Sequence, residues 1–403
     1  MKDQKENLLP GIRILDLADE KASFCSRLLA DLGADVVKIE RPGGDPSRRT
    51  GPFFGDPPHP ERSLFFNYHN TNKRGITLNL ENRVGREIFL RLVKRSDVVL
   101  ETFPPGYLRN LGLDFEVLRE GNPGLIMASV TGFGQEGPRS KYKSCDIVAS
   151  AFGGQMYVSG SPVTPPLKPF GEQSYYAASL FAAIGILLVL RKRKETGKGE
   201  HLDISLQEAV ASTLEHVMIR YLYEKIVSKR RGNIHWSNAI CILACKDGFM
   251  VITLFQQWET LVEWMDSEGM AEDLREEKYR EEEYRFRNLD HIIEVIRRWT
   301  KTHTKNELFE SGQLMRFPWA PVVSPEEVLE NPQLKARRFF IDVEHPEMST
   351  SVKYPGVPYQ ISTSLPKKWK RAPFTGEDNI QIYTEELGLS EEDLRRLSSM
   401  KVI

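Results

Sequence analysis

Two cysteines four residues apart, Cys241 and Cys245, are the most obvious pair of chemical groups in this sequence. Thiolates at this spacing can bind zinc, but a structural zinc site needs two further ligands. No second pair of cysteines or histidines lies at metal-binding spacing. The letters around the pair, CILAC, are apolar, which is typical of a buried strand. We therefore expect a buried strand here and no metal site.

The common motifs of cofactor binding and hydrolysis are missing from the sequence. No glycine follows the first predicted strand before Gly33, which argues against the GxGxxG turn that holds a nicotinamide or flavin dinucleotide. The sequence also has no GxxxxGK[ST] phosphate loop, no GxSxG nucleophile elbow and no HExxH zinc motif. These patterns assign no reaction, and we expect no tightly bound cofactor.

Strands and helices alternate along the first half of the chain. The predicted strands are 12–18, 35–40, 96–103, 125–133 and 201–206, and the predicted helices are 22–32, 84–95, 173–194 and 207–224. Because these strands are continuous apolar runs that alternate with helices, they favour a parallel sheet covered on both faces. We therefore predict an α/β fold.

The pattern changes after residue 226. Residues 239–253 predict a hairpin with its turn at 246–248, and two charged amphipathic helices follow at 257–268 and 289–301. We therefore predict three parts along the chain: the first part of a large domain over 1–226, a smaller α+β domain over 227–325, and a segment over 326–403 that returns to the large domain.

Composition and charge narrow the classes of function. The 403 residues include 55 basic and 56 acidic side chains, so a net charge of −1 gives no overall attraction for nucleic acid or an anionic membrane. The most apolar run, 174–190, is shorter than the ~18–20 residues that usually span a bilayer, which favours a buried core helix. With only four cysteines and no signal-peptide pattern, we expect a cytoplasmic protein.

Seven longer segments resemble the class III CoA-transferases, the family of formyl-CoA transferase and carnitine CoA-transferase. They occur in the same order along almost the whole chain: 11–17, 28–42, 72–78, 101–114, 128–138, 196–210 and 319–340. The resemblance implies a Rossmann-like large domain, a smaller domain, and two chains threaded through each other as an interlocked-ring dimer. It also implies transfer of coenzyme A (CoA) from an acyl-CoA to a carboxylic acid, through an aspartate that attacks the acyl thioester.

The chain departs from the family where that aspartate should lie. Aligning Ser179 with the small residue that follows the family's aspartate by four positions places Tyr175 at the aspartate position. A neutral phenol, with a pKa near ~10, is a weak nucleophile at pH 7. Glu172 lies one helical turn earlier and is a weak substitute, because a shift of about a turn moves the carboxylate by several ångströms. We predict that this subunit has no nucleophile of its own.

The CoA-binding positions that the resemblance implies are partly retained. Arg41 would contact the nucleotide end of CoA, Leu78 and Phe103 would flank the adenine or the pantetheine, and Lys143 would reach a phosphate. Lysine and arginine are the physically suitable side chains for phosphate, as a point charge and as a planar fork respectively. The alternative is that Arg41 and Lys143 are ordinary surface charges.

Other positions differ from the family pattern. Thr102 stands where asparagine is common, and Asn110 stands where arginine is common, with Arg109 beside it as a candidate phosphate contact. The turn after the first strand, 21–24, is bulky and charged, whereas the family has a small glycine-containing turn that approaches CoA closely. These differences indicate a weakened or altered site.

We therefore predict a non-catalytic subunit of a class III CoA-transferase that pairs with an active paralogous subunit. The exchange would involve succinyl-CoA and an aromatic dicarboxylic acid, in anaerobic degradation of aromatic compounds. Two alternatives remain open: an active interlocked homodimer that uses Glu172, and a CoA-binding structural protein without a catalytic partner. In each case CoA or acyl-CoA is the expected ligand, as a substrate and not as a tightly bound cofactor.

Overall fold

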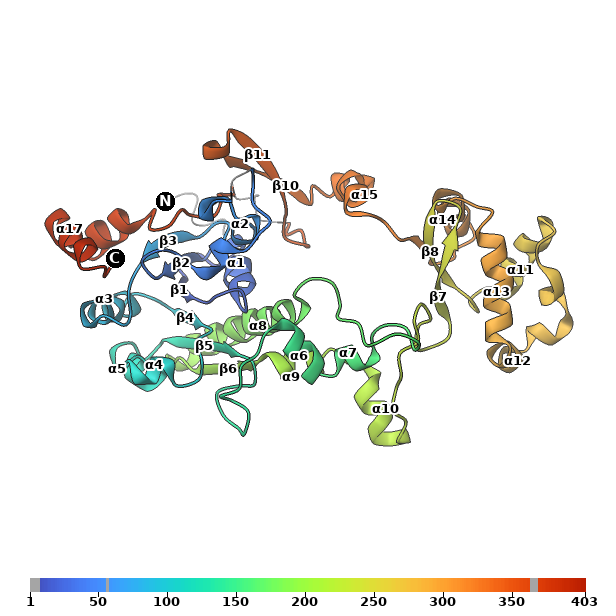
Figure 1. Cartoon of the computed structure of the whole chain (residues 1–403), viewed down its shortest axis with the longest axis horizontal. Coiled ribbons are helices and arrows are strands. Elements are labelled where there is room, and N and C mark those ends of the chain that lie inside the picture. Colours follow the sequence, from blue (N-terminus) through green and yellow to red (C-terminus); the bar gives the residue numbers. More distant parts are fainter. Residues whose placement is uncertain (1–7, 56–57, 363–368) are drawn as a thin grey trace. The chain divides into compact units, whose positions relative to one another are not determined.

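The computed structural model describes residues 8–55, 58–362 and 369–403, and the chain divides into two compact units (Figure 1). The first unit contains the chain up to Gln155, then Lys168–Tyr223 and Ala336–Ile403. The second unit contains Met156–Leu167 and Glu224–Lys335. The small domain predicted over 227–325 falls inside the second unit.

A six-stranded parallel sheet forms the centre of the first unit. Its strands are β1 (Arg13–Leu17), β2 (Asp35–Glu40), β3 (Arg74–Thr77), β4 (Val98–Glu101), β5 (Ile126–Thr131) and β6 (His201–Ser205), in the order β3-β2-β1-β4-β5-β6. All neighbours are parallel, and Ile14 of β1 lies beside Val36 of β2 on one side and Val98 of β4 on the other. The strand order reverses between β1 and β4, and the predicted parallel sheet is confirmed.

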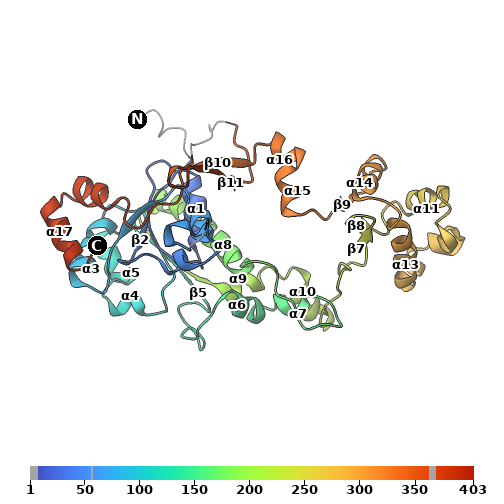
Figure 2. The same cartoon turned by 45° about the horizontal axis from the view of Figure 1, so that its top comes forward.

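Helices cover both faces of this sheet. One face packs on α1 (Ser23–Asp31), α6 (Asp146–Phe152), α8 (Gln173–Thr196) and α9 (Leu206–Ala211), and the other on α3 (Arg83–Val93), α5 (Phe115–Gly121) and α17 (Glu391–Ser399) (Figures 1 and 2). Because successive side chains of a strand point to opposite faces, Ile14 joins the first cluster and Leu15 joins the second. Both are fully buried, so the sheet is the core of this unit.

Helix α8 is the most apolar segment of the chain. Within the described residues it is the one helix long and apolar enough to cross a membrane by length and composition, and 50% of its most apolar window is buried. Its inner face, with Ala178, Ala182 and Ile186, packs against the sheet and α1. Its outer face leaves Leu180 and Leu188 exposed. Packing against the sheet therefore explains the apolar residues on the inner face of α8, but not those on its outer face.

The prediction of one continuous helix over 207–224 is wrong. The structure has two helices here, α9 and α10 (His216–Glu224). The hydroxyls of Ser212 and Thr213 donate hydrogen bonds back to the carbonyls of Glu208 and Val210, and Glu215 takes a φ of 45°. Side chains that bond to nearby carbonyls compete with the helix ladder, and a left-handed residue interrupts it.

The second unit has its own sheet and core. Strands β7 (Ile240–Cys245), β8 (Gly248–Thr253) and β9 (Ala320–Pro321) form an antiparallel sheet, and β7 and β8 make the predicted hairpin. Trp299 and Trp319 are fully buried in the cluster that fills this unit. Cys241 and Cys245 lie buried in β7, but the strand as a whole is not buried as predicted, because its burial alternates and Ile242 is exposed.

Shorter elements complete the two units. The first unit also contains the short helices α2 (Leu64–His69) and α4 (Tyr107–Asn110), the hairpin of β10 (Phe340–His345) and β11 (Thr350–Pro355), and the helical turns η2 (Pro46–Arg49), η3 (Pro60–Arg62), η6 (Pro346–Met348) and η7 (Gln381–Glu386). The helices that lie wholly or mostly in the second unit are α7 (Gln155–Val158), α11 (Trp258–Ser267), η4 (Glu272–Arg275), η5 (Glu277–Arg280), α12 (Glu282–Arg287), α13 (Leu289–Thr300), α14 (Lys305–Leu314), α15 (Pro325–Glu330) and α16 (Pro332–Ala336).

Candidate functional site

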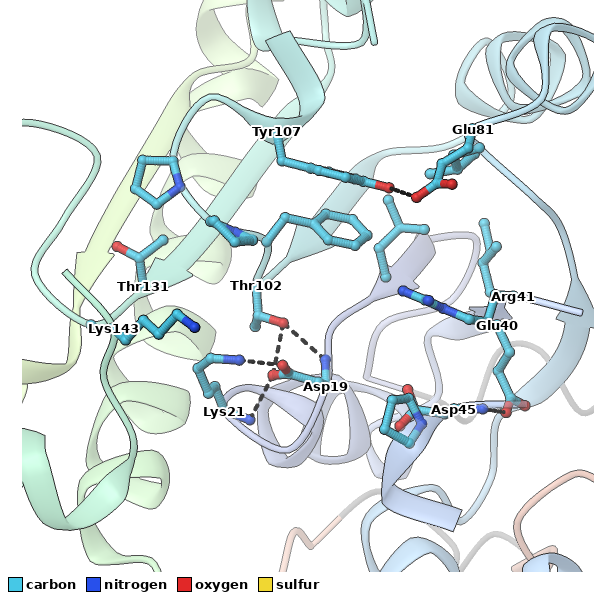
Figure 3. A pocket seen from close by; sticks show the side chains of 18 of the residues that line it. Asp19, Lys21, Glu40, Arg41, Asp45, Glu81, Thr102, Tyr107, Thr131 and Lys143 are labelled. Carbon is cyan, nitrogen blue, oxygen red and sulfur yellow. Dashed lines mark hydrogen bonds and ion pairs between the residues drawn. The ribbon is translucent and has the colours of Figure 1, made fainter. Parts of the chain in front are cut away.

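A cavity of about 760 Å³ lies at the carboxyl ends of the strands, entirely within the first unit. Its walls are the segments that follow β1, β2, β3, β4 and β5, and they include Asp19, Arg41, Leu78, Thr102 and Lys143 (Figure 3). In open parallel sheets, ligands bind outside the carboxyl ends of the strands, at the point where the strand order reverses. The cavity therefore lies where this topology places a ligand, and its volume suits a small-molecule or coenzyme site.

The cavity has a surplus of unpaired positive charge. Each acidic side chain of its wall is bonded to a neighbour: Asp19 to Lys21 and Thr102, Glu40 to Arg48, Asp45 to Lys38, and Glu81 to Tyr107. By contrast, Arg41, Lys141, Lys143 and Lys401 make no ion pair or side-chain hydrogen bond with any described residue. Figure 3 shows Arg41 and Lys143 pointing toward the cavity from opposite sides. The cavity can therefore bind an extended anion with several negative groups.

Thr102 links β1 and β4 at the floor of the cavity. Its hydroxyl donates to Asp19 Oδ1 at 2.8 Å and accepts from the Asp19 backbone N–H at 2.9 Å. The backbone N–H of Lys21 donates to the same carboxylate at 3.1 Å, and the Lys21 ammonium pairs with it. The turn after β1 is thus closed around a carboxylate. Sequence reasoning singled out Thr102 but missed Asp19, although an acidic residue directly after the first strand was a visible signal.

An aromatic pair from the segment that follows β4 forms one wall of the cavity. The rings of Phe103 and Tyr107 are stacked, with centroids 4.6 Å apart and an interplanar angle of 30°. The Tyr107 hydroxyl donates to Glu81 Oε1 at 3.3 Å, and burial together with that carboxylate raises the pKa of Tyr107. Leu78 is buried nearby in the same cluster. An aromatic surface beside the unpaired Arg41 can hold a planar base, and Tyr107 was missed from the sequence.

Tyr175 and Glu172 lie at the start of α8 and do not line this cavity. Tyr175 is 6% exposed, and its hydroxyl accepts a hydrogen bond from the backbone N–H of Asp146 at 3.0 Å. Burial and the carboxylate of Glu20 raise the pKa of Tyr175 above its usual range. Burial, Glu20 and Asp146 also raise the pKa of Glu172, which is half-buried. The phenol is therefore neutral, and the carboxylate of Glu172 lies near two other carboxylates, Glu20 and Asp146.

Arg109 and Asn110 lie apart from the cavity wall. Arg109 is largely exposed on α4, and its guanidinium lies 3.6 Å from the carboxylate of Asp114. Neither residue is among those that line the cavity. The structure therefore brings Arg41, Leu78, Thr102, Phe103 and Lys143 together around one cavity and leaves Arg109 outside it. No group of three histidine, cysteine, aspartate or glutamate side chains in the described ranges is placed to hold a metal ion.

A buried carboxyl below the cavity should make stability depend on pH. Glu101 is 3% exposed at the end of β4, and it accepts a hydrogen bond from the Phe103 backbone N–H at 2.6 Å. Burial raises the pKa of Glu101 to about 7, from 4.5. The folded chain therefore binds this proton more tightly than the unfolded chain, so the stabilisation is full below pH 4.5 and is lost as the pH rises through 7.

Glu101→Gln should remove this dependence, because the amide keeps the acceptor for the Phe103 N–H and carries no charge. As the pH rises from 5 to 8, the free energy of unfolding of the variant should increase relative to that of the wild type, by up to about 3 kcal/mol. Urea denaturation at both values of pH measures the difference. Parallel pH profiles for the two proteins would contradict this assignment.

Comparison with known proteins gives a consistent result. Residues 9–379 match the model of CoA-transferase family III, which confirms the resemblance found in the sequence. The chain is 32% identical to subunit BbsE of succinyl-CoA:(R)-benzylsuccinate CoA-transferase from Thauera aromatica, over 93% of each chain. It is 33% identical to formyl-CoA:oxalate CoA-transferase from Streptomyces coelicolor, over 98% of this chain and 99% of that one.

Two further similarities concern assembly and fold. The beta subunit of succinyl-CoA–L-malate CoA-transferase from Chloroflexus aurantiacus is 31% identical over 98% of each chain. The crystal structure of a CAIB/BAIF family protein from Brucella suis matches with a TM-score of 0.85 and 30% identity, over 94% of this chain and 99% of that one.

Proposed function

This chain belongs to CoA-transferase family III, and on that premise we propose that it is a subunit that binds acyl-CoA but supplies no nucleophile. In this proposal it works in a hetero-oligomer, and an active paralogous subunit provides the aspartate. The observation that carries the proposal is Tyr175, whose neutral, buried hydroxyl is bonded to the Asp146 backbone at the position where the family has its aspartate.

The surroundings of Tyr175 also argue against a substitute nucleophile. Covalent catalysis here needs an ionised carboxylate that attacks the thioester carbonyl while the CoA thiolate leaves. Glu172 lies outside the cavity, and its raised pKa reflects burial and the nearby carboxylates Glu20 and Asp146. Like charges at this turn disfavour both ionisation and the approach of a second carboxylate.

The cavity supports CoA as the ligand. CoA carries a 3′-phosphate, a diphosphate and an adenine, and the cavity offers unpaired cations and a stacked aromatic pair. The strand order β3-β2-β1-β4-β5-β6 is that of dinucleotide-binding sheets, which supports the Rossmann-like description. CoA thioesters are substrates in this family, and we propose the same role here, without a tightly bound cofactor.

Exposed apolar surface in the first unit supports a partner chain. On α8 the side chains of Leu180, Phe181, Ile184 and Leu188 are each at least 45% exposed, and Met218 and Tyr223 are exposed on α10. Soluble chains seldom leave such apolar surface uncovered. We propose that a second chain covers it, in an interlocked arrangement with the paralogue or, in the alternative assembly, with a copy of this chain.

The relatives suggest the exchange. BbsE is named as a subunit of an enzyme for succinyl-CoA and (R)-benzylsuccinate, and the Chloroflexus aurantiacus relatives are named as alpha and beta subunits of a succinyl-CoA–L-malate enzyme. We propose succinyl-CoA and an aromatic dicarboxylic acid as substrates, in anaerobic aromatic degradation. The four free cysteines fit a reducing cytoplasm.

Co-expression tests the assembly. The chain is produced with a paralogue that has aspartate at the position of Tyr175, and the native mass and CoA exchange of the purified complex are measured. We expect a mixed oligomer that is active, while this chain alone is inactive. An active self-dimer would support the alternative that uses Glu172, and CoA binding without any pairing would support the structural-protein alternative.

Two arginines give a matched test of the binding site. Arg41→Ala removes an unpaired guanidinium from the cavity wall, whereas Arg109→Ala removes an exposed one outside it. Since a charge-assisted contact contributes about 1.5 kcal/mol or more, Arg41→Ala should weaken CoA binding about tenfold. Arg109→Ala should leave affinity unchanged. Isothermal titration with CoA measures both, and equal effects would contradict the assignment of this cavity.

A further inference from the structure

We propose that Lys401 binds the 3′-phosphate of CoA and is delivered to the cavity by the segment that follows α17. The inference rests on the proposed function, because it takes CoA as the ligand. Lys401 lines the cavity together with Asn79, Leu80 and Glu81, the residues that follow β3. Its side chain makes no ion pair or hydrogen bond among the described residues.

The backbone of Lys401 is held firmly against the β3 side of the cavity. The next residue, Val402, is fully buried in the cluster under α3, and its carbonyl accepts a hydrogen bond from the Asn79 backbone N–H at 2.8 Å. The Asn79 side-chain amide also donates to the Lys401 carbonyl, at 3.4 Å. Gly85 permits this packing, since a Cβ there would meet the Asn79 carbonyl oxygen at 2.0 Å. The backbone of the lysine is therefore fixed beside the cavity without a ligand.

Lys401 also occupies a backbone conformation that favours glycine. Its φ is 54°, and it follows Met400, the residue that caps the C-terminus of α17. The Val402 N–H bonds back to the Leu397 carbonyl at 2.9 Å, closing the helix end in the manner usually built around glycine. After α8, the chain uses Gly197 at this place, with a φ of 69°. A lysine here therefore costs stability that a glycine would restore.

Backbone strain alone would not identify a site, because Arg316 has a φ of 65° after α14. What distinguishes Lys401 is that the strained residue also places an unpaired ammonium at the cavity. Strained residues persist where the surrounding structure and a function maintain them. Lys401 fits that description, and Arg316 is exposed and lies outside the cavity.

The charge and position of Lys401 select the 3′-phosphate among the groups of CoA. In the proposed function, the acyl end of CoA faces the start of α8, where Tyr175 takes the place of the family's aspartate. Lys401 lies beside the segment after β3, on the sheet's opposite edge from β6, and Arg41 follows the neighbouring strand β2. A phosphate monoester carries a charge of about −1.5 to −2 at pH 7, and two unpaired cations match it.

The test uses the full chain with two ligands, CoA and 3′-dephospho-CoA. Lys401→Gly should weaken CoA binding about fivefold to tenfold and leave 3′-dephospho-CoA binding within about twofold, since one charge-assisted contact is lost. The same variant should raise the Tm by a few degrees, because glycine relieves the strain. Lys401→Gln should lose the same affinity without the gain in Tm.

Arg316→Gly is the matched control, because it removes a positive charge and the same kind of strain outside the cavity. It should raise the Tm and leave both affinities unchanged. Equal losses for CoA and 3′-dephospho-CoA, or no loss for either, would overturn the role of Lys401 and leave CoA binding by the chain intact. A wild-type chain that binds neither ligand would overturn both this inference and the proposed function.

Discussion

Replacing Glu172 by glutamine should leave CoA exchange by the mixed complex within about twofold of the wild-type rate, because the residue supplies no nucleophile. Replacing the aspartate of the paired subunit by asparagine should lower exchange on the order of 10³-fold or more, as expected when the group that forms the covalent intermediate is lost. Steady-state rates with succinyl-CoA and a dicarboxylic acid measure both effects.

The local structure around Glu172 gives the reason. Glu172 precedes α8 and lies outside the cavity, away from the position of the family's aspartate. Burial and the carboxylates of Glu20 and Asp146 raise the pKa of Glu172, which disfavours its ionised form. Glu20→Gln is the matched control, because Glu20 is a second half-buried carboxyl whose charge affects Tyr175. It should also retain activity. Loss of exchange in Glu172→Gln alone would establish the alternative, an enzyme that uses Glu172.

Lys73→Met should lower the free energy of unfolding by about 3–5 kcal/mol, because it leaves the buried carboxylate of Asp16 without its partner. Asp16 is part of β1, both side chains are fully buried, and Lys73 Nζ lies 2.9 Å from Asp16 Oδ2. The same ammonium donates to Ser26 Oγ and Asn70 Oδ1, at 2.8 Å each. Burial opposes the charge of Asp16, but Lys73 and Lys38 hold its pKa below the usual range.

Two further variants separate the lost ion pair from lost packing. The double variant Asp16→Asn, Lys73→Met should recover more than half of the loss, because no uncompensated charge stays buried. Lys192→Met breaks a pair with Glu200 in which both side chains are about half exposed, and it should cost less than about 1 kcal/mol. Chemical denaturation measures all three. A small cost for Lys73→Met would show that Asp16 is satisfied without it.

The sheet of the first unit was predictable because its strands are long apolar runs that alternate with helices. The strand β3 escaped prediction, since Arg74–Thr77 has four residues and includes an arginine and a glycine. The break between α9 and α10 was also missed, because it depends on local hydrogen bonds of Ser212 and Thr213 that no apolar periodicity reveals.

Part of the candidate site was predictable from the resemblance to the family. Arg41 and Phe103 were expected at the site from the resemblance, and they do line the cavity. Tyr107 was missed because its part in the cavity depends on stacking against Phe103. Lys401 was missed because about 320 residues separate it from Asn79, and only the tertiary fold brings the two together.

Trapping the covalent intermediate tests the central claim most directly. The mixed complex is incubated with acyl-CoA, quenched, treated with hydroxylamine or borohydride, and both chains are mapped by peptide mass spectrometry. Our account predicts a modified aspartate in the paired subunit and an unmodified peptide containing Glu172 and Tyr175. A modified Glu172, or a CoA adduct on any side chain of this protein, would contradict it.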